Sequence, residues 1–222
     1  MERIKNKTQV TNSHYHFDTY SSERRFISYY HQVKNILQFV KSKQIKRILI
    51  AGKGDGVVQK ILEAYNTLMD LDLTVHTFDF AEDLNPDFLG DLLELDKIVT
   101  EEYDLILCCQ VLEHIPQNEA LQVISSMKNI ANHVVISLPY KAITFRGSFK
   151  APVLPEFEFC IKLPVIKSFG DMVDERHYWE LGASISVPKF KQKLIELGYQ
   201  ILDSYILKKH GNIFFLILEA QK

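Results

Sequence analysis

The feature that most constrains the fold is a glycine-rich turn between an apolar run and a helical pattern, at residues 47–62. The apolar residues 48–51 lead into glycines at 52, 54 and 56, and a helical pattern begins at Val57. Glycine has no Cβ, so it adopts positive φ readily and lets a ligand approach the backbone closely. The N-terminus of a following helix directs unpaired N–H groups at such a turn. The stretch predicts a strand, a turn and a helix that hold a polar ligand, or else an ordinary βα turn rich in glycine.

Length, charge and cysteine content limit the class of protein. The chain has 222 residues, of which 46% are hydrophobic, enough for one domain with a substantial core. Its 26 basic and 28 acidic residues give a net charge of -2, so we expect no nucleic-acid partner. The first residues lack the apolar region of a signal peptide, and no apolar run is long enough to span a membrane, so we expect no membrane partner either. Cysteines at 108, 109 and 160 form neither a disulfide framework nor a zinc pattern, which favours a reducing, cytoplasmic location.

Strand and helix patterns alternate along most of the chain. The predicted helices cover residues 22–43, the stretch after Val57, the stretch after Pro116, and 187–197; the predicted strands cover 47–51, 73–80, 103–110, 134–138, 199–207 and 213–218. The last two strands are joined by a short turn containing Gly211 and Asn212, which predicts an antiparallel hairpin. We therefore expect an α/β fold with a mostly parallel sheet.

Residues 140–186 interrupt this alternation. They are rich in Phe, Pro and β-branched residues and predict one or two extra strands or a projecting hairpin, followed by a polar and aromatic loop at 174–182. Long insertions in compact domains are usually lids or partner surfaces. The insertion therefore predicts a substrate lid or, alternatively, an arm that forms a homodimer.

Polar residues follow the predicted strands at one edge of the sheet. In open α/β sheets a ligand binds beyond the carboxyl ends of the strands, and Asp79 ends the second strand at a spacing that suits a ribose contact. Asp91 is a further candidate for a polar contact, and Gln110, Glu113 and His114 follow the strand at 103–110. His114 is the first candidate for a general base and His177 the second. A packing or capping role for His114 and a stacking role for the segment around His177 are the structural alternatives, and no metal-ligand spacing is recognisable.

In this order the motifs resemble those of the class I S-adenosylmethionine-dependent methyltransferases, of the bacterial small-molecule branch similar to methyltransferase types 11 and 23. Residues 52–56 look like the family's glycine turn, Asp79 matches its ribose-binding acid, and 90–92 look like the segment beside the adenine. Residues 110–116, QVLEHIP, are similar to the motif next to the sulfonium, and 177–180 look like a segment of bacterial members that carry an inserted arm.

The resemblance implies a three-layer Rossmann-like sheet, mostly parallel with an antiparallel C-terminal hairpin and an inserted arm or lid. It divides the chain into an N-terminal arm and helix (1–44), a cofactor-binding core (45–139), the insertion (140–186) and a C-terminal helix and hairpin (187–222). It implies methyl transfer from S-adenosylmethionine to a small molecule, with a hydroxyl of a sugar or secondary metabolite as acceptor. The residues that it places at the cofactor are Gly52, Lys53, Gly54, Asp79, Phe80, Asp91, Leu92, Gln110 and Glu113.

The sequence departs from the family at Ile50, where an acidic residue usually orients the ammonium group of the cofactor. A charged group without one partner loses about 1.5–3 kcal/mol. A catalytically impaired binding or regulatory protein on the same fold is therefore an alternative. An NAD-dependent oxidoreductase is a lesser one, because its Gly-x-Gly-x-x-Gly motif would need glycine where Val57 stands. A nucleic-acid adenine methyltransferase would need its Pro-Pro-Tyr motif after Cys109, whereas residues 138–140 follow the next strand.

Overall fold

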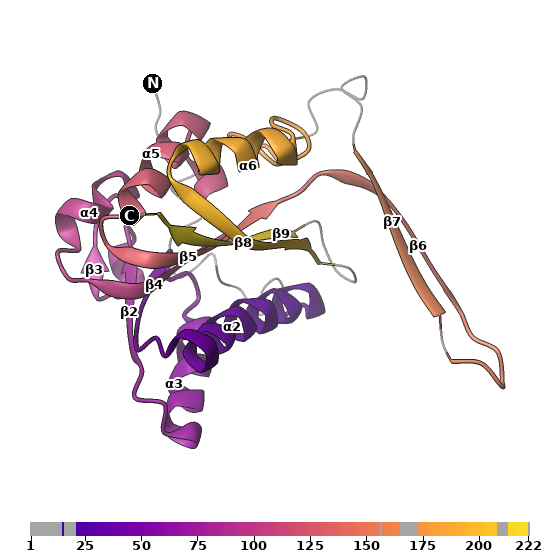
Figure 1. Cartoon of the computed structure of the whole chain (residues 1–222), viewed down its shortest axis with the longest axis horizontal. Coiled ribbons are helices and arrows are strands. Elements are labelled where there is room, and N and C mark those ends of the chain that lie inside the picture. Colours follow the sequence, from indigo (N-terminus) through magenta and orange to yellow (C-terminus); the bar gives the residue numbers. More distant parts are fainter. Residues whose placement is uncertain (1–14, 16–20, 156, 165–172, 208–212, 222) are drawn as a thin grey trace.

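The computed structural model describes residues 15, 21–155, 157–164, 173–207 and 213–221. They form a seven-stranded sheet of order β3-β2-β1-β4-β5-β9-β8 and a separate two-stranded sheet, β6-β7 (Figure 1). The strands of the large sheet are β1 (Arg47–Ala51), β2 (Thr74–Asp79), β3 (Phe88–Leu89), β4 (Tyr103–Cys109), β5 (Ala131–Pro139), β8 (Tyr199–Ile206) and β9 (Ile213–Ala220). The predicted α/β architecture is therefore confirmed.

Helices cover both faces of the large sheet and complete three layers. One face packs against α2 (Glu23–Lys43) and α3 (Val57–Met69), and the other against α4 (Leu95–Ile98), α5 (Gln117–Met127) and α6 (Val187–Glu196), as Figure 1 shows. Short 3-10 helices, η3 (Glu82–Leu84), η4 (Leu92–Glu94) and η5 (Leu112–His114), follow the carboxyl ends of β2, β3 and β4. Among the described residues, no helix is both long and apolar enough to cross a membrane.

Strand β4 lies at the centre of the sheet because both of its faces are apolar. Leu105 and Leu107 pack toward α2 and α3, whereas Ile106 and Cys108 pack toward α5 and α6. The strand pairs in parallel with β1 and β5, as expected for a continuous apolar run. The parallel strands β1, β2, β4 and β5 therefore end at one edge of the sheet, which is where ligands bind in such folds.

The C-terminal strands close the sheet in antiparallel fashion. Strand β9 pairs antiparallel with β5 and with β8, so the predicted C-terminal hairpin is confirmed, although its turn lies outside the described residues. Helix α6 begins after Ser186, whose hydroxyl accepts a hydrogen bond from Lys189 N at 3.4 Å. Strand β5 begins at Ala131, earlier than residue 134 as predicted, because Tyr103 of β4 pairs with it there.

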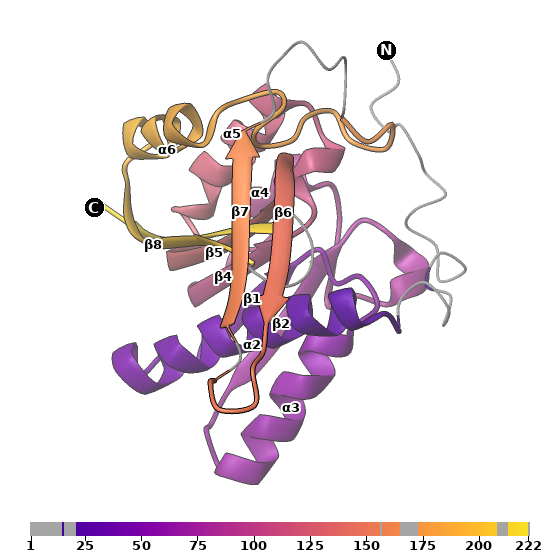
Figure 2. The same cartoon turned by 90° about the vertical axis from the view of Figure 1, so that its right-hand side faces the viewer.

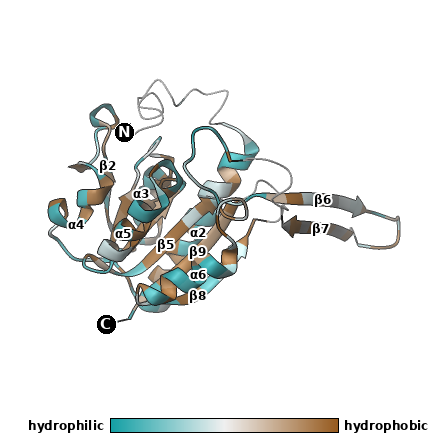
Figure 3. Ribbon diagram, turned by 90° about the horizontal axis from the view of Figure 1, so that it is seen from above, coloured by the Kyte–Doolittle hydropathy of each residue, from teal (hydrophilic) through white to brown (hydrophobic). Residues whose placement is uncertain are grey.

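Strands β6 (Ala142–Phe149) and β7 (Phe157–Pro164) form the projecting hairpin that the insertion predicts. The hairpin leaves the sheet after β5 and extends away from the body of the domain (Figures 1 and 3). Figure 2 shows it face on, with the body of the domain behind it. After it the chain returns to the sheet, where Leu181 bridges to Tyr140. Apart from Tyr15, the predicted N-terminal arm before residue 21 lies outside the described residues.

Candidate functional site

The glycine turn lies between β1 and α3, at the carboxyl edge of the sheet. Gly52, Gly54 and Gly56 have φ values of 92°, 58° and 72°, all in the region that favours glycine. A Cβ on Gly52 would also lie 2.3 Å from Cγ2 of Val111, the residue just before η5. The turn therefore needs glycine for its backbone angles and, at Gly52, for space as well.

Asp79 meets this turn directly. Its side chain is buried, and its carboxylate accepts hydrogen bonds from Gly54 N at 3.3 Å and from Ala81 N at 3.1 Å. The structure thus brings together two residues that lie 25 positions apart in the chain. Both residues lie at the sheet edge where the sequence places them, and they meet because β1 and β2 pair in parallel and end side by side.

The side chains of the turn are held by neighbouring elements. Lys53 Nζ donates to the carbonyl oxygen of Asn85 at 2.6 Å. The carboxylate of Asp55 accepts from Val57 N at 3.1 Å and from the hydroxyl of Tyr29 on α2. The hydroxyl of Tyr15 lies 3.6 Å from the position that a Cβ on Gly54 would take. Helix α2 and the described residue of the N-terminal arm therefore lie beside the turn.

Three further predicted cofactor residues follow β2 and β3. Phe80 is 46% exposed and directly follows Asp79. Asp91 caps η4, since its carboxylate accepts from Leu93 N at 2.9 Å, and Leu92 is the first residue of that helix. The structure places these residues after the strand ends as predicted, and their contact with a cofactor stays a prediction.

The backbone turns sharply where β4 ends. Gln110 has a φ of 58°, which is uncommon for a residue other than glycine, and its N–H donates to Ser137 O at 2.9 Å. Its side-chain amide donates to the Ser137 hydroxyl at 3.4 Å. Strained backbone of this kind is concentrated at functional sites. The turn aims η5, and with it Glu113 and His114, back toward the segment that follows the hairpin.

Glu113, His114 and His177 form one cluster, called the acid–imidazole cluster below. A carboxylate oxygen and one ring nitrogen from each histidine lie within 4.8 Å of one another. The two imidazole rings are 5.0 Å apart, centroid to centroid, and meet edge to face. Both predicted base candidates and one predicted cofactor residue therefore lie together, although His177 comes from a distant part of the chain.

Trp179 fixes the segment that carries His177. Its buried indole N–H donates to the carbonyl oxygens of Leu112 and Ile115, each at 3.2 Å. In addition, Tyr178 N donates to Glu113 O at 2.8 Å. These contacts hold residues 177–180 against η5, and sequence reasoning did not anticipate this role for Trp179.

Each imidazole of the cluster is oriented through its Nδ1. Nδ1 of His114 lies 3.2 Å from Arg176 O, and Nδ1 of His177 lies 2.6 Å from a carboxylate oxygen of Glu180. Glu180 is itself buried, and its other oxygen lies 3.5 Å from Lys141 Nζ. Glu180 is a second residue of the site that the sequence did not single out.

Burial sets the protonation of the cluster. It raises the pKa of Glu113 to about 8, an effect that nearby Glu180 reinforces and Arg25 opposes. Burial, together with the neighbouring His177, lowers the pKa of His114 to about 4. Burial also tends to raise the pKa of Glu180. The hydrogen bond with His177 and the charge of Lys141 outweigh burial and leave the pKa of Glu180 below its usual value. His114 is therefore a neutral imidazole near pH 7.

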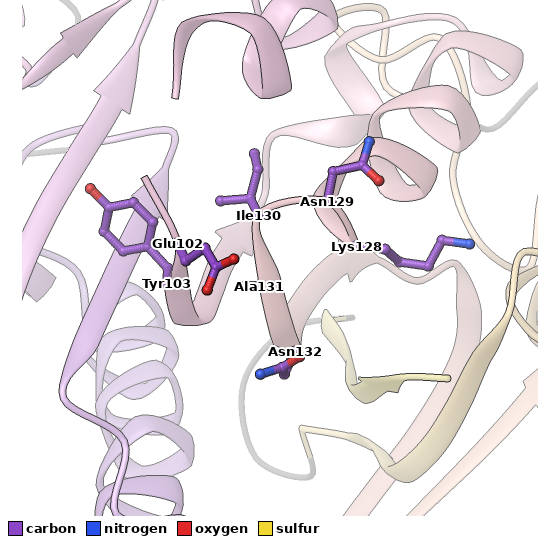
Figure 4. A pocket seen from close by; sticks show the side chains of 7 residues that line it. All are labelled: Glu102, Tyr103, Lys128, Asn129, Ile130, Ala131 and Asn132. Atoms are coloured by element: carbon purple, nitrogen blue, oxygen red, sulfur yellow. The ribbon is translucent and has the colours of Figure 1, made fainter. Parts of the chain in front are cut away.

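The opposite edge of the sheet carries a different feature. A depression of about 50 Å³ is lined by Glu102, Tyr103, Lys128, Asn129, Ile130, Ala131 and Asn132, where β4 and β5 begin (Figure 4). It lies at the amino ends of these strands. None of the predicted site residues belongs to it.

Comparison with known proteins shows the fold. No family model matches the chain, and no curated protein matches it by sequence. Among solved structures, the small RNA methyltransferase HEN1 matches 86% of this chain with a TM-score of 0.56 and 14% identity; this chain spans only 25% of HEN1. The magnesium protoporphyrin IX methyltransferase ChlM from Synechocystis PCC 6803, with bound SAM, matches 86% of this chain and 80% of its own. The TM-score is 0.53 and the sequence identity is 16%.

An O-methyltransferase family protein from Burkholderia thailandensis matches 99% of this chain and 66% of its own, with a TM-score of 0.55 and 11% identity. The chain thus has the three-layer, Rossmann-like fold that these methyltransferases share. Identities this low establish the fold alone. The acceptors that the names indicate, RNA and a porphyrin among them, also differ too widely to select one.

Proposed function

We propose that this chain is an S-adenosylmethionine-dependent methyltransferase that acts on a hydroxyl group of a small molecule. The observation that carries the proposal is the hydrogen bond from Gly54 N to the carboxylate of Asp79, at the edge of a sheet with the methyltransferase fold. It joins a glycine turn, which suits close backbone contact with a ligand, to a buried acid, which suits the hydroxyls of a ribose.

The residues at this edge of the sheet fit the ribose of the cofactor but not its ammonium group. Gly52 and Gly54 have no side chain to cover the backbone, and the Asp79 carboxylate, which accepts one backbone hydrogen bond on each oxygen, has lone pairs left for ribose hydroxyls. S-adenosylmethionine would supply a methyl group already activated on a sulfonium. Ile50 is buried among apolar side chains, so it offers the ammonium group no acidic partner. We therefore expect binding that is weaker than in family members with the acid.

Methyl transfer asks the protein for positioning and, with a hydroxyl acceptor, for removal of a proton. Positioning supplies on the order of 7–11 kcal/mol, and a general base adds roughly 10²–10⁴-fold. His114 is a poor base at neutral pH, because burial and the neighbouring His177 lower its pKa to about 4. His177 is held by Glu180 in the manner of a catalytic imidazole and is the better candidate to take the proton directly. We therefore propose His177, rather than His114, as the general base.

Calorimetric titration tests the proposal. The chain should bind S-adenosylmethionine and its demethylated product, and Asp79→Ala should weaken both, whereas Asp72→Ala, an exposed change beside Lys46, should not. Binding of NAD in place of both would establish the oxidoreductase alternative and refute the proposal. If the chain binds S-adenosylmethionine and its demethylated product but methylates no hydroxyl acceptor, the hypothesis of a catalytically impaired binding or regulatory protein would remain.

We also propose that the β6–β7 hairpin pairs with the hairpin of a second copy. One face of the hairpin is apolar, and its side chains are 38–65% exposed. They belong to cross-strand pairs: Ile143 with Leu163, Phe145 with Ile161, Gly147 with Phe159, and Phe149 with Phe157. An isolated two-stranded hairpin is marginally stable in water, so this face needs a cover.

A second hairpin is a suitable cover because a twofold axis matches the apolar face to itself. These seven half-exposed apolar side chains would bury roughly 600–700 Å² per copy, near the ~800 Å² of a standard interface. Light scattering should show a dimer that Phe145→Ser with Phe157→Ser converts to a monomer, whereas Ser148→Ala, outside the apolar pairs, does not. A monomeric native chain whose acceptor turnover depends on these phenylalanines would instead establish a lid.

A cytoplasmic location, expected from the cysteines, stays a prediction.

A further inference from the structure

We propose that the acid–imidazole cluster of Glu113, His114 and His177 binds a first-row divalent transition-metal ion. The three donor atoms lie within 4.8 Å of one another, and they come from η5 and from the segment after the hairpin. Ligands about 2.1 Å from a common tetrahedral ion lie ~3.4 Å apart. Side-chain adjustments of up to about 1 Å therefore bring all three donors onto one ion.

The two imidazoles are oriented as metal ligands usually are. A ligating histidine donates its other ring N–H to a carbonyl or carboxylate, which fixes the tautomer and aims the free nitrogen at the metal. His114 has Arg176 O beside its Nδ1, and His177 has the Glu180 carboxylate beside its own. Both rings therefore keep Nε2 for an ion.

Glu113 supplies an independent indication. Its side chain is 1% exposed, and its Oε2 has no hydrogen-bond partner among the described residues. A buried carboxylate oxygen without a partner is unfavourable by several kcal/mol, so such an atom calls for an explanation. A cation at the cluster would satisfy this oxygen, and the charge of Arg25 acts on the same carboxyl in the same direction.

The donor set selects the kind of ion. Two imidazoles with one carboxylate are found at catalytic Zn²⁺ and at open Fe²⁺ sites, whereas Mg²⁺ and Ca²⁺ prefer oxygen ligands throughout. Three protein ligands leave positions for water or an acceptor oxygen. An acceptor hydroxyl bound there would lose its proton to water more readily, so with the ion bound this route would replace the direct proton removal by His177 proposed above. This role rests on the proposed methyl transfer, whereas binding of the ion does not.

Cobalt and zinc are suitable probes. Metal-stripped protein should bind about one Co²⁺ with the visible d–d absorption of an ion held by nitrogen and oxygen, and Zn²⁺ should displace it. His177→Asn and Glu113→Gln should each weaken Co²⁺ at least tenfold, and Glu180→Gln, which removes only the orienting carboxylate, by about 10–100-fold. His133→Gln is the matched control, because this imidazole lies near Glu219 at the amino ends of β4 and β5. A double change of His14 and His16 to Gln controls for imidazoles elsewhere in the sequence.

The proposal is overturned if Co²⁺ gives no d–d absorption with native protein, or if the cluster variants bind it as tightly as the His133 control. Circular dichroism of each variant shows whether it folds, and the result with native protein holds even if a variant does not. Titration of S-adenosylmethionine in the presence of a chelator tests the cofactor site separately. If Co²⁺ does not bind but S-adenosylmethionine does, the metal-site proposal fails. If S-adenosylmethionine does not bind but Co²⁺ does, the proposed methyltransferase function fails.

Discussion

Gly52→Ala is the change whose effect the structure defines most closely. A Cβ at this position meets two obstacles: a φ of 92° and Cγ2 of Val111 at 2.3 Å. Left-handed backbone costs an L-residue roughly 1–2 kcal/mol, and forcing an extra methyl into a packed site costs a further ~1–3 kcal/mol. We therefore expect Gly52→Ala to lower the free energy of unfolding by about 2–5 kcal/mol.

Two further variants separate the obstacles. Gly56→Ala introduces positive-φ strain alone, because its Cβ would lie 3.8 Å from the nearest atom, Lys53 Cε, and it should lose only ~1–2 kcal/mol. Val111→Ala removes the clashing methyl, so the double variant with Gly52→Ala should show a favourable coupling of about 1–3 kcal/mol.

Urea denaturation measures all four free energies, with the native chain as reference. If the coupling is zero, the clash with Val111 does not exist and the turn does not pack against the end of β4. If Gly52→Ala and Gly56→Ala lose the same free energy, strain alone explains the need for glycine. Calorimetry on the same proteins should show weaker S-adenosylmethionine binding for Gly52→Ala, because the turn that holds it must move.

Three other changes probe the site and its support. Trp179→Phe keeps the ring but leaves two carbonyls at η5 without their donor, so urea unfolding should show a loss of about 1–3 kcal/mol and cobalt binding should weaken; unchanged cobalt affinity would count against the orienting role. Ile50→Glu buries a carboxylate, so it should lower the melting temperature of the protein without ligand. It should also enlarge the increase in melting temperature that S-adenosylmethionine causes, because the new carboxylate can pair with the ammonium group. An increase equal to that of the native chain would show that the ammonium group lies elsewhere. Asp87 accepts hydrogen bonds from Thr77 N and Oγ1 at 2.8 and 2.7 Å, and these hold its pKa below the usual value although burial opposes them, so Asp87→Asn should cost about 1–2 kcal/mol at pH 7. That contribution is present above the unfolded pKa of 3.8 and is lost as pH falls through the lower folded pKa, so the gap between the two proteins should narrow from pH 6 to pH 3, and a constant gap would contradict the assignment.

The sequence predicts the sheet and the common edge at which Gly54 and Asp79 lie for one physical reason. Parallel strands end at a common edge, so residues that follow consecutive strands meet there whatever the loops do. The same reasoning places Gln110, Glu113 and His114 at this edge. It cannot predict that Ile50 lies in the apolar layer toward α2 and α3. That placement depends on which face of the sheet the side chain of Ile50 points to.

His177 is the residue that such reasoning cannot locate. It follows a hairpin that leaves the sheet, and strand order says nothing about where the returning chain comes to rest. Its position is set by the indole of Trp179, which needs a hydrogen-bond acceptor when buried and finds two in the carbonyls of η5. Spacing rules for metal ligands assume that neighbours in sequence share a site, so they could not unite His177 with Glu113, which lies 64 positions earlier. A buried tryptophan two residues from a histidine, after a strand-end acid and imidazole, is the signal that could have suggested the pairing.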